Sequence, residues 1–151
     1  MASDMTSLLE VAHLVLAVVA VGTNLSFPIW TFLAERDGRS LAFTLRAVRW
    51  VDRWVTIPAY LLTAVSGVAL VAVERVDPLA LWIAGSTALF VALMVLGFAA
   101  YRPVSRLRLA AAARGPRDAA YRSASRRAAA LDVAILGAAL AILVLMVVRP
   151  E

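Results

Sequence analysis

The stretch from Leu79 to Tyr101 reads LALWIAGSTALFVALMVLGFAAY and contains no formally charged side chain. At a rise of about 1.5 Å per residue, a helix of this length crosses a hydrocarbon core of roughly 30 Å. Two further stretches are also uncharged, and a fourth contains one aspartate near its edge: Val11 to Ala34, Trp54 to Val73, and Ala128 to Val148. A soluble domain of 151 residues would expose apolar surface that it could not hide. The sequence therefore predicts four membrane-spanning helices.

The composition supports this interpretation for the whole chain. Hydrophobic residues make up 63% of the sequence and the mean hydropathy is +0.86, which excludes disorder and argues against an ordinary globular class. No internal repeat, linker or low-complexity tail indicates a second domain. We therefore predict one all-α domain over residues 1–151, a four-helix transmembrane bundle with spans at about 8–34, 54–73, 79–101 and 128–148.

The arginines indicate how the bundle is oriented. All 15 basic residues are arginine, and 13 of them fall in the connections after the first and third spans. Because basic residues concentrate in cytoplasmic loops, both connections are predicted to face the cytoplasm and both termini the periplasm. An alanine-rich chain with arginine as its only basic residue suggests a bacterial genome, and hence the bacterial inner membrane. The net charge of +5 is then expected to meet anionic lipid headgroups, and no nucleic acid.

Local signals predict where the helices begin. Ser7 followed by Glu10 is typical of a capping box that opens the first helix, which contains Pro28 and is expected to kink there. Asp77-Pro78 predicts an N-cap and first position for the third helix. Ser40 is a candidate cap for the second helix.

In the third connection, the sequence predicts a short alanine-arginine helix to about Arg114. Gly115-Pro116 then separates it from a last helix that runs continuously from Arg117 to Val148.

His13 is the only histidine and lies about one turn inside the outer end of the first span. At 100° per residue, Glu10, His13, Ala17 and Asn24 fall within a sector of about 60°, so this polar stripe is predicted to face the bundle interior. Ionisable groups within spans are costly and commonly functional, which makes His13 a candidate ligand. The alternative is that His13 meets water or hydrogen-bonds a neighbouring helix.

The absence of cysteine excludes disulfides, thiolate metal sites, covalent c-type haem and iron–sulfur clusters. One histidine gives too few ligands for zinc or binuclear copper, and copper handling by His13 and four methionines is a weaker alternative. Haem b needs only one or two imidazole or thioether ligands and a pocket between apolar helices. His13 could supply one axial position, while Met94 and Met146 are weak candidates for the second.

Two aspartates lie at the inner ends of spans. Asp52 faces the same side as a stripe of small and hydroxyl residues on the second helix, a pattern typical of close helix packing in lipid: Thr56, Ala59, Thr63, Ser66 and Gly67. We expect Asp52 to pair with an arginine of the third connection, or Asp132 with Arg127 or Arg53, with a proton or substrate role as the alternative.

Sparse motifs along nearly the whole chain also support a family resemblance. They are Glu10 to Leu14, Pro28, Arg49 to Ala59 (RWVDRWVTIPA), Thr63, Gly67, Trp82 and Met146 to Pro150. On these residues the chain resembles an uncharacterised family of small, predicted four-helix integral membrane proteins of bacteria, a domain of unknown function. The broader group includes the HemJ-type protoporphyrinogen IX oxidase and the membrane domain of copper-resistance protein D.

The likeness to the HemJ type implies that His13, fifteen residues before Pro28, is a haem b ligand. The chain departs from that type at Ile29, where the type has an arginine, and near Gly85, where it has a lysine; the sequence contains no lysine. The additional histidines of the type are also missing, so an oxidase activity stays open.

The leading hypothesis is an inner-membrane protein that binds haem b through His13, with Asn24 on the same polar stripe, and that acts in electron transfer or redox sensing. With one histidine per chain, the sixth haem position stays open or two copies share one haem as a homo-oligomer. The alternative is a membrane accessory subunit or small permease without a cofactor, with the arginine-rich third connection docking a partner or anionic lipid.

Overall fold

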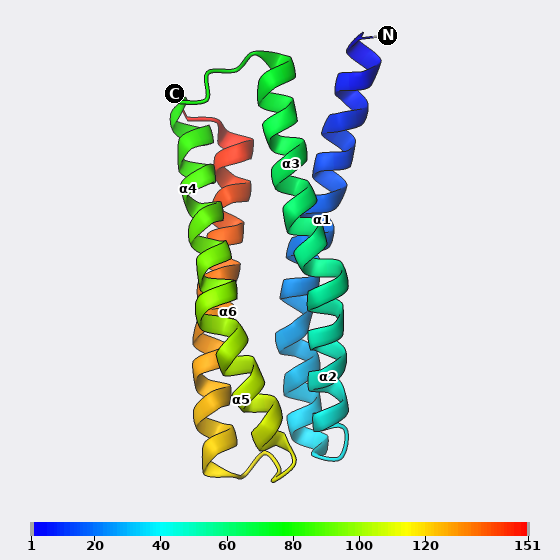
Figure 1. Ribbon diagram of the computed structural model, residues 1–151, viewed down its shortest axis with the longest axis vertical. Coiled ribbons are helices and arrows are strands. Elements are labelled where there is room, and N and C mark those ends of the chain that lie inside the picture. Colours follow the sequence, from blue (N-terminus) through cyan, green and yellow to red (C-terminus); the bar gives the residue numbers. More distant parts are fainter. Residues whose placement is uncertain (1, 151) are drawn as a thin grey trace.

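Residues 2–150, which the computed structural model describes, form helices joined by three short connections (Figure 1). The first helix is α1 (Ala2–Asp37). The second runs without a break through α2 (Leu41–Val51), the π-helical η1 (Asp52–Thr56) and α3 (Ile57–Glu74). The third runs through α4 (Leu81–Val95), the π-helical η2 (Leu96–Tyr101) and α5 (Arg102–Ala112), and the last is α6 (Ala119–Val148).

Each of these four helices is long and apolar enough to cross a membrane, which confirms the predicted all-helical fold with four spans. Few residues in the apolar windows are buried inside the protein, between 6% and 22% of each window. Large apolar side chains point outward instead, such as Leu8 at 70% exposed, Val68 at 72% and Val147 at 82%. Surfaces of this kind are compatible with lipid and not with water.

The two ends of the bundle differ. The start of α1, the end of α6 and the connection between α3 and α4 lie together at one end, here named the outer end (Figure 1). The other two connections lie at the opposite, inner end. Of the 15 arginines, the 13 that sequence analysis assigned to the first and third connections lie in the inner half.

Two predicted helix starts differ from the structure, whereas Ser40 is the N-cap residue of α2 as predicted. Helix α1 already begins at Ala2, so Ser7 and Glu10 lie inside it and form no capping box. Helix α4 begins at Leu81 and not at Asp77, because Asp77 accepts the backbone N–H of Leu79 (2.9 Å) and closes a turn before the helix. At Ser40 the side chain makes no capping hydrogen bond; its hydroxyl donates to Asp37 (2.8 Å).

The last helix starts close to where the sequence predicted. Helix α6 begins at Ala119, two residues after Arg117, because Asp118 is its N-cap and accepts the backbone N–H of Tyr121 at 3.0 Å. That hydrogen bond, with Arg114 nearby, holds the pKa of the Asp118 carboxyl below its usual value. The preceding helix does not stand alone, because α5 continues α4 and η2 without a break.

The helices pack as two hairpins that meet in the inner half. Helix α1 packs along α2, η1 and α3, while α6 packs along α4, η2 and α5 (Figure 1). The hairpins meet where α1 contacts α6 and α2 contacts α5, and an edge-on contact between the rings of Tyr60 and Phe90 lies between them. Small buried residues such as Ala20, Ala59 and Ala139 let the backbones approach closely.

A polar cluster at the inner end joins α1, α5 and α6. One Glu35 carboxylate oxygen accepts from Arg108 Nη2 (2.9 Å), the Tyr121 hydroxyl (2.7 Å) and the Ser125 hydroxyl (2.9 Å). The Arg108 side chain is only 9% exposed. The cluster consists of Glu35, Arg108, Tyr121 and Ser125 and is named the Glu35 cluster.

The Glu35 cluster corrects the predicted ion pairs. Among residues 2–150, Asp52 and Asp132 form no ion pair within 4 Å, whereas Glu35 pairs with Arg108 and Asp118 pairs with Arg114. The prediction ended the third helix near Arg102 and placed a separate short helix in the third connection. Because α5 instead extends the third helix to Ala112, it carries Arg108 against α1.

Removing the Glu35 carboxylate should loosen the inner end. We expect Glu35→Ala to lower the stability of the detergent-solubilised protein by about 2 kcal/mol, because the buried Arg108 guanidinium loses its charged partner. Glu74→Ala, at an exposed carboxylate at the end of α3, is the matched control and should change stability little. Thermal unfolding followed by circular dichroism measures both, and equal melting temperatures would contradict a role for the Glu35 cluster.

Candidate functional site

His13 lies against α3 in the outer half of the bundle. Its Nδ1 is 2.9 Å from the Ser66 hydroxyl oxygen. The Ser66 hydroxyl also lies within hydrogen-bond distance of the carbonyl oxygens of Leu62 (2.8 Å) and Thr63 (3.0 Å), which can only accept. A hydroxyl has one hydrogen, and when one of these carbonyls accepts it, His13 Nδ1–H is the donor to Ser66. In that tautomer the neutral ring has its lone pair on Nε2.

Gly67 makes room for the His13 ring. A Cβ placed on Gly67 would lie 3.1 Å from His13 Cε1, closer than such atoms normally approach. The stripe of small residues predicted on the second helix thus has a specific consequence here: the absence of a side chain at Gly67 lets the imidazole pack against α3. His13 is partly buried in this position, and Glu10, one turn away, is exposed.

Asn24, the second residue of the predicted polar stripe, has a different neighbour. Its Nδ2 donates to the Tyr60 hydroxyl at 2.7 Å. Asn24 is eleven residues from His13, or about 16 Å along the helix. The structure therefore does not bring the two residues together at one point, although both face α3. Between them in sequence and adjacent to Asn24, Thr23 accepts a hydrogen bond from Thr56 at 2.9 Å.

The two methionines weighed as second ligands lie apart from each other along the bundle. Met94 packs against the central apolar core and borders a cavity in the inner half. Met146 lies in the last turn of α6, at the outer end.

The inner half contains a polar cavity of about 50 Å³, here named the inner cavity. Both membrane-embedded aspartates line it, Asp52 from η1 and Asp132 from α6. Its other polar lining residues are Asn24, Tyr60, Tyr101 and Arg102, and its apolar lining includes Phe27, Leu93, Met94 and Ile135.

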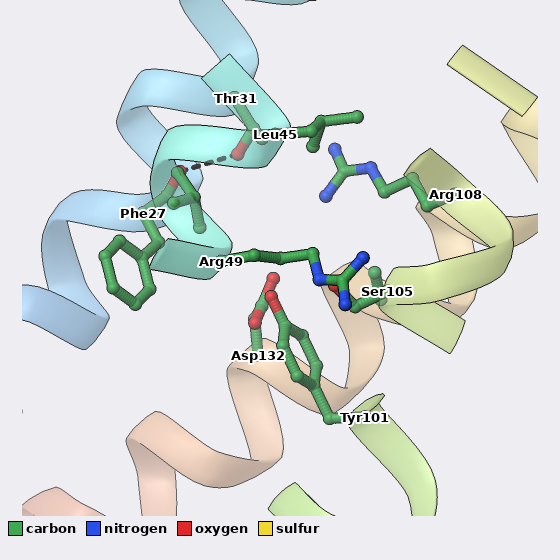
Figure 2. A pocket seen from close by; sticks show the side chains of 10 residues that line it. Phe27, Thr31, Leu45, Arg49, Tyr101, Ser105, Arg108 and Asp132 are labelled. Atoms are coloured by element: carbon green, nitrogen blue, oxygen red, sulfur yellow. Dashed lines mark hydrogen bonds between the residues drawn. The ribbon is translucent and has the colours of Figure 1, made fainter. Parts of the chain in front are cut away.

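A smaller cavity of about 10 Å³ adjoins it on the side of the inner end, sharing Phe27, Tyr101 and Asp132 and adding Arg49, Ser105 and Arg108. In Figure 2, Tyr101 and Asp132 point toward each other and Arg49 reaches across from the second helix toward them. Thr31, on the far wall, donates to the carbonyl oxygen of Phe27 at 2.6 Å (Figure 2).

Both π-helical segments border the inner cavity. Asp52 opens η1, while Gly97, Phe98 and Tyr101 belong to η2. A π-helical turn holds an extra residue, which changes the direction of the side chains on either side of it, and such turns are frequent at functional sites. No pattern of hydrophobic residues distinguishes a π from an α turn, so sequence reasoning missed this site. The usable signal was the presence of two acidic residues within spans.

The arrangement of possible metal ligands bears on which metal sites the bundle could contain. Among residues 2–150, no three histidine, aspartate or glutamate side chains gather closely enough to hold a metal ion. The imidazole of His13 and the carboxylates of the inner cavity lie in different halves of the bundle. A cofactor that supplies most of its own metal ligands, such as haem, needs only the imidazole.

Comparison with known proteins gives a family. Residues 7–150 match the model of the family described as "Predicted integral membrane protein (DUF2269)". No curated protein and no solved structure matches the chain.

The packing of His13 on Gly67 predicts a difference between two glycines. Gly22 and Gly67 both lie inside helices, but a Cβ on Gly22 would meet nothing within 4 Å. Alanine is favoured over glycine in helices by up to about 1 kcal/mol, so Gly22→Ala should leave stability unchanged or raise it. Gly67→Ala should give no gain in stability or should lower it, because the added methyl group would force the His13 ring to move. Melting temperatures in one detergent compare the pair, and an equal gain in both would show that His13 does not rest on Gly67.

Proposed function

Because the chain belongs to this family of predicted integral membrane proteins, we propose that it is a multi-pass protein of the bacterial cytoplasmic membrane that binds haem b, with His13 as an axial ligand. The observation that supports this proposal most directly is the hydrogen bond from His13 Nδ1 to Ser66. Histidine ligands characteristically donate their second ring N–H to a neighbouring acceptor, which fixes the tautomer and leaves the other nitrogen free to bind metal.

The surroundings of His13 fit an axial ligand. Ser66 restrains the ring from α3, and the missing side chain at Gly67 gives the ring a flat surface to lie on. Apolar side chains of α1 around His13 are exposed, including Leu14 at 60% and Val18 at 63%, and they suit an apolar macrocycle. Bound haem supplies an iron that changes oxidation state, which suits electron transfer or redox sensing. Since the chain has one histidine, the sixth position is open or filled by His13 of a second copy.

The proposed orientation puts the inner end in the cytoplasm and both termini in the periplasm. The arginines at the start of α6 support a contact with anionic lipid headgroups, since Arg122, Arg126 and Arg127 are all exposed there. Arg117 is exposed in the connection just before them. The periplasmic location of the outer end would put His13 near the periplasmic face.

A second candidate function needs no cofactor. The same His13–Ser66 hydrogen bond also satisfies the imidazole within the protein, as expected of a membrane accessory subunit or small permease. The two functions differ in one readily measured property, visible absorption, so a spectrum of the purified protein separates them.

Protein purified in detergent after expression with adequate haem is expected to show a Soret band. His13→Ala should abolish the band, and Ser66→Ala should weaken haem affinity by about 10-fold or more, because the ring loses its hydrogen-bond acceptor. Thr63→Ala is the control on the same helix, since the Thr63 hydroxyl donates only to its own helix at the Ala59 carbonyl. It should leave the band unchanged.

Two results would remove the haem proposal: a wild-type protein without a Soret band, or a band that His13→Ala leaves intact. Size-exclusion chromatography of each variant checks that the bundle is folded. A spectrum typical of two axial histidines, found together with a dimer, would assign the sixth ligand to a second copy.

A further inference from the structure

The inner cavity brings together two carboxylates that come from different hairpins. Asp52 reaches it from η1 and Asp132 from α6. Neither carboxylate has an ion-pair partner within 4 Å among the residues that the structure describes. Acidic side chains within membrane spans are rare and costly, and they commonly mark routes of ions or protons. The two aspartates therefore need an explanation that the Glu35 cluster does not provide.

Several helices contribute the other charged and titratable groups around the cavity. Arg102 of α5 lines the inner cavity together with both aspartates, and Arg49 of α2 lines the smaller cavity together with Asp132. Asp132 has Arg108 of α5 on its side, but that guanidinium is already bound to Glu35 at 2.9 Å. Two tyrosines, Tyr60 of α3 and Tyr101 of η2, complete the titratable lining, and Asn24 of α1 is bound to the former. The two carboxylates thus share the guanidinium groups of Arg49 and Arg102, and Asp132 is the one that Tyr101 faces.

This lining selects among ligands. Three guanidinium groups in or beside the cavity oppose a metal cation, and two carboxylates oppose an anion. A proton is compatible with both, because it removes one of two like charges that share a site of low dielectric constant. The proton needs no coordination shell, only a carboxylate and a route by which to exchange.

Water and Tyr101 can provide that route. A water needs roughly 10–15 Å³ of cavity volume, so a cavity of about 50 Å³ has room for several and its neighbour of about 10 Å³ for about one. Tyr101 lines both cavities and faces Asp132 (Figure 2). The smaller cavity leads toward the inner end, past Ser105 and Arg49. Polar groups therefore continue from Asp132 toward the inner end.

We propose that the inner cavity is a proton-binding site in which Asp132 holds a proton, Asp52 remains charged, and exchange runs through water and Tyr101 to the inner face of the membrane. In the exchange step the O–H bond of the Asp132 carboxylic acid breaks and the proton passes to a cavity water. That water, or Tyr101 in concert with it, passes a proton onward, and Asp132 is left as carboxylate. No electrons move. The site does not depend on haem.

Infrared difference spectroscopy of the full-length protein in lipid, titrated with pH, tests the proposal. The wild-type protein should show the C=O stretching band of a protonated carboxylic acid, with a shift in D₂O. Asp132→Asn should remove the band. Asp52→Asn should move its titration to lower pH, because the neighbouring like charge is gone. Asp77→Asn, at an exposed aspartate outside the cavity, is the matched control and should change nothing.

Tyr101→Phe keeps the test decisive if an asparagine variant fails to fold, since it removes only a hydroxyl. It should shift the frequency of the band, because the group facing Asp132 is lost, while Glu35→Gln should leave the band in place. A band unaffected by Asp132→Asn and Tyr101→Phe would overturn the proposal, as would the lack of any protonated carboxyl over the pH range in which the protein is folded. Loss of the band on adding sodium or potassium at constant pH would assign the cavity to a metal cation and also overturn it.

Discussion

Hydrocarbon cannot hydrogen-bond, and this one property of the solvent explains where the polar side chains of the bundle lie. A polar group left unpaired in lipid costs several kcal/mol, so the spans must pair such groups with each other. Helices α1 and the second helix do so at three levels: Thr23 with Thr56, Asn24 with Tyr60, and His13 with Ser66. These bonds fix the register of the two helices. Among the described side chains, the buried Ser86 hydroxyl is left without a hydrogen-bond partner.

The same constraint separates the two halves of the protein. In the inner half the hairpins are fastened by the Glu35 cluster, and buried charge is tolerated because polar groups from three helices surround it. In the outer half the backbones of α3 and α4 are not in contact. There the ionisable side chain of His13 on α1 forms a hydrogen bond with Ser66 of α3. The proposed proton site in the inner cavity and the proposed haem ligand His13 thus lie in different halves of the bundle. Two functions of different chemistry can therefore occupy one bundle without competing for residues.

Sequence reasoning succeeded where hydrophobicity alone decides the outcome. Uncharged runs such as Leu79 to Tyr101 predicted the spans, and the arginines predicted which connections share an end. It failed where a helix could continue. Arg102-Pro103 was interpreted as a break between the third helix and a separate short helix, yet η2 continues into α5, since Pro103 sits in the first turn where its missing N–H costs little.

The candidate sites were predictable only in part. The isolation of His13 in an apolar span made it a candidate ligand or a hydrogen-bonding partner of another helix, but Ser66 as its partner depends on the register between α1 and α3, which one sequence does not reveal. Asp52 and Asp132 were expected to form ion pairs. The structure gives that role to Glu35 instead, and Asp52 of the π-helical η1 and Asp132 of α6 line a common cavity. Neither the turns nor the cavity leaves a pattern in the residue order.

The most direct test uses the absence of cysteine, since single cysteines then report their positions without background. Cells expressing Arg39→Cys, Leu79→Cys, Arg117→Cys or Val68→Cys variants can be treated with a membrane-impermeant thiol reagent, before and after permeabilisation. Four spans in the proposed orientation, with the inner end in the cytoplasm, require that Leu79→Cys reacts in intact cells, that Arg39→Cys and Arg117→Cys react only after permeabilisation, and that the lipid-facing Val68→Cys reacts in neither case. Equal labelling of all four positions would mean that water, not lipid, surrounds these helices.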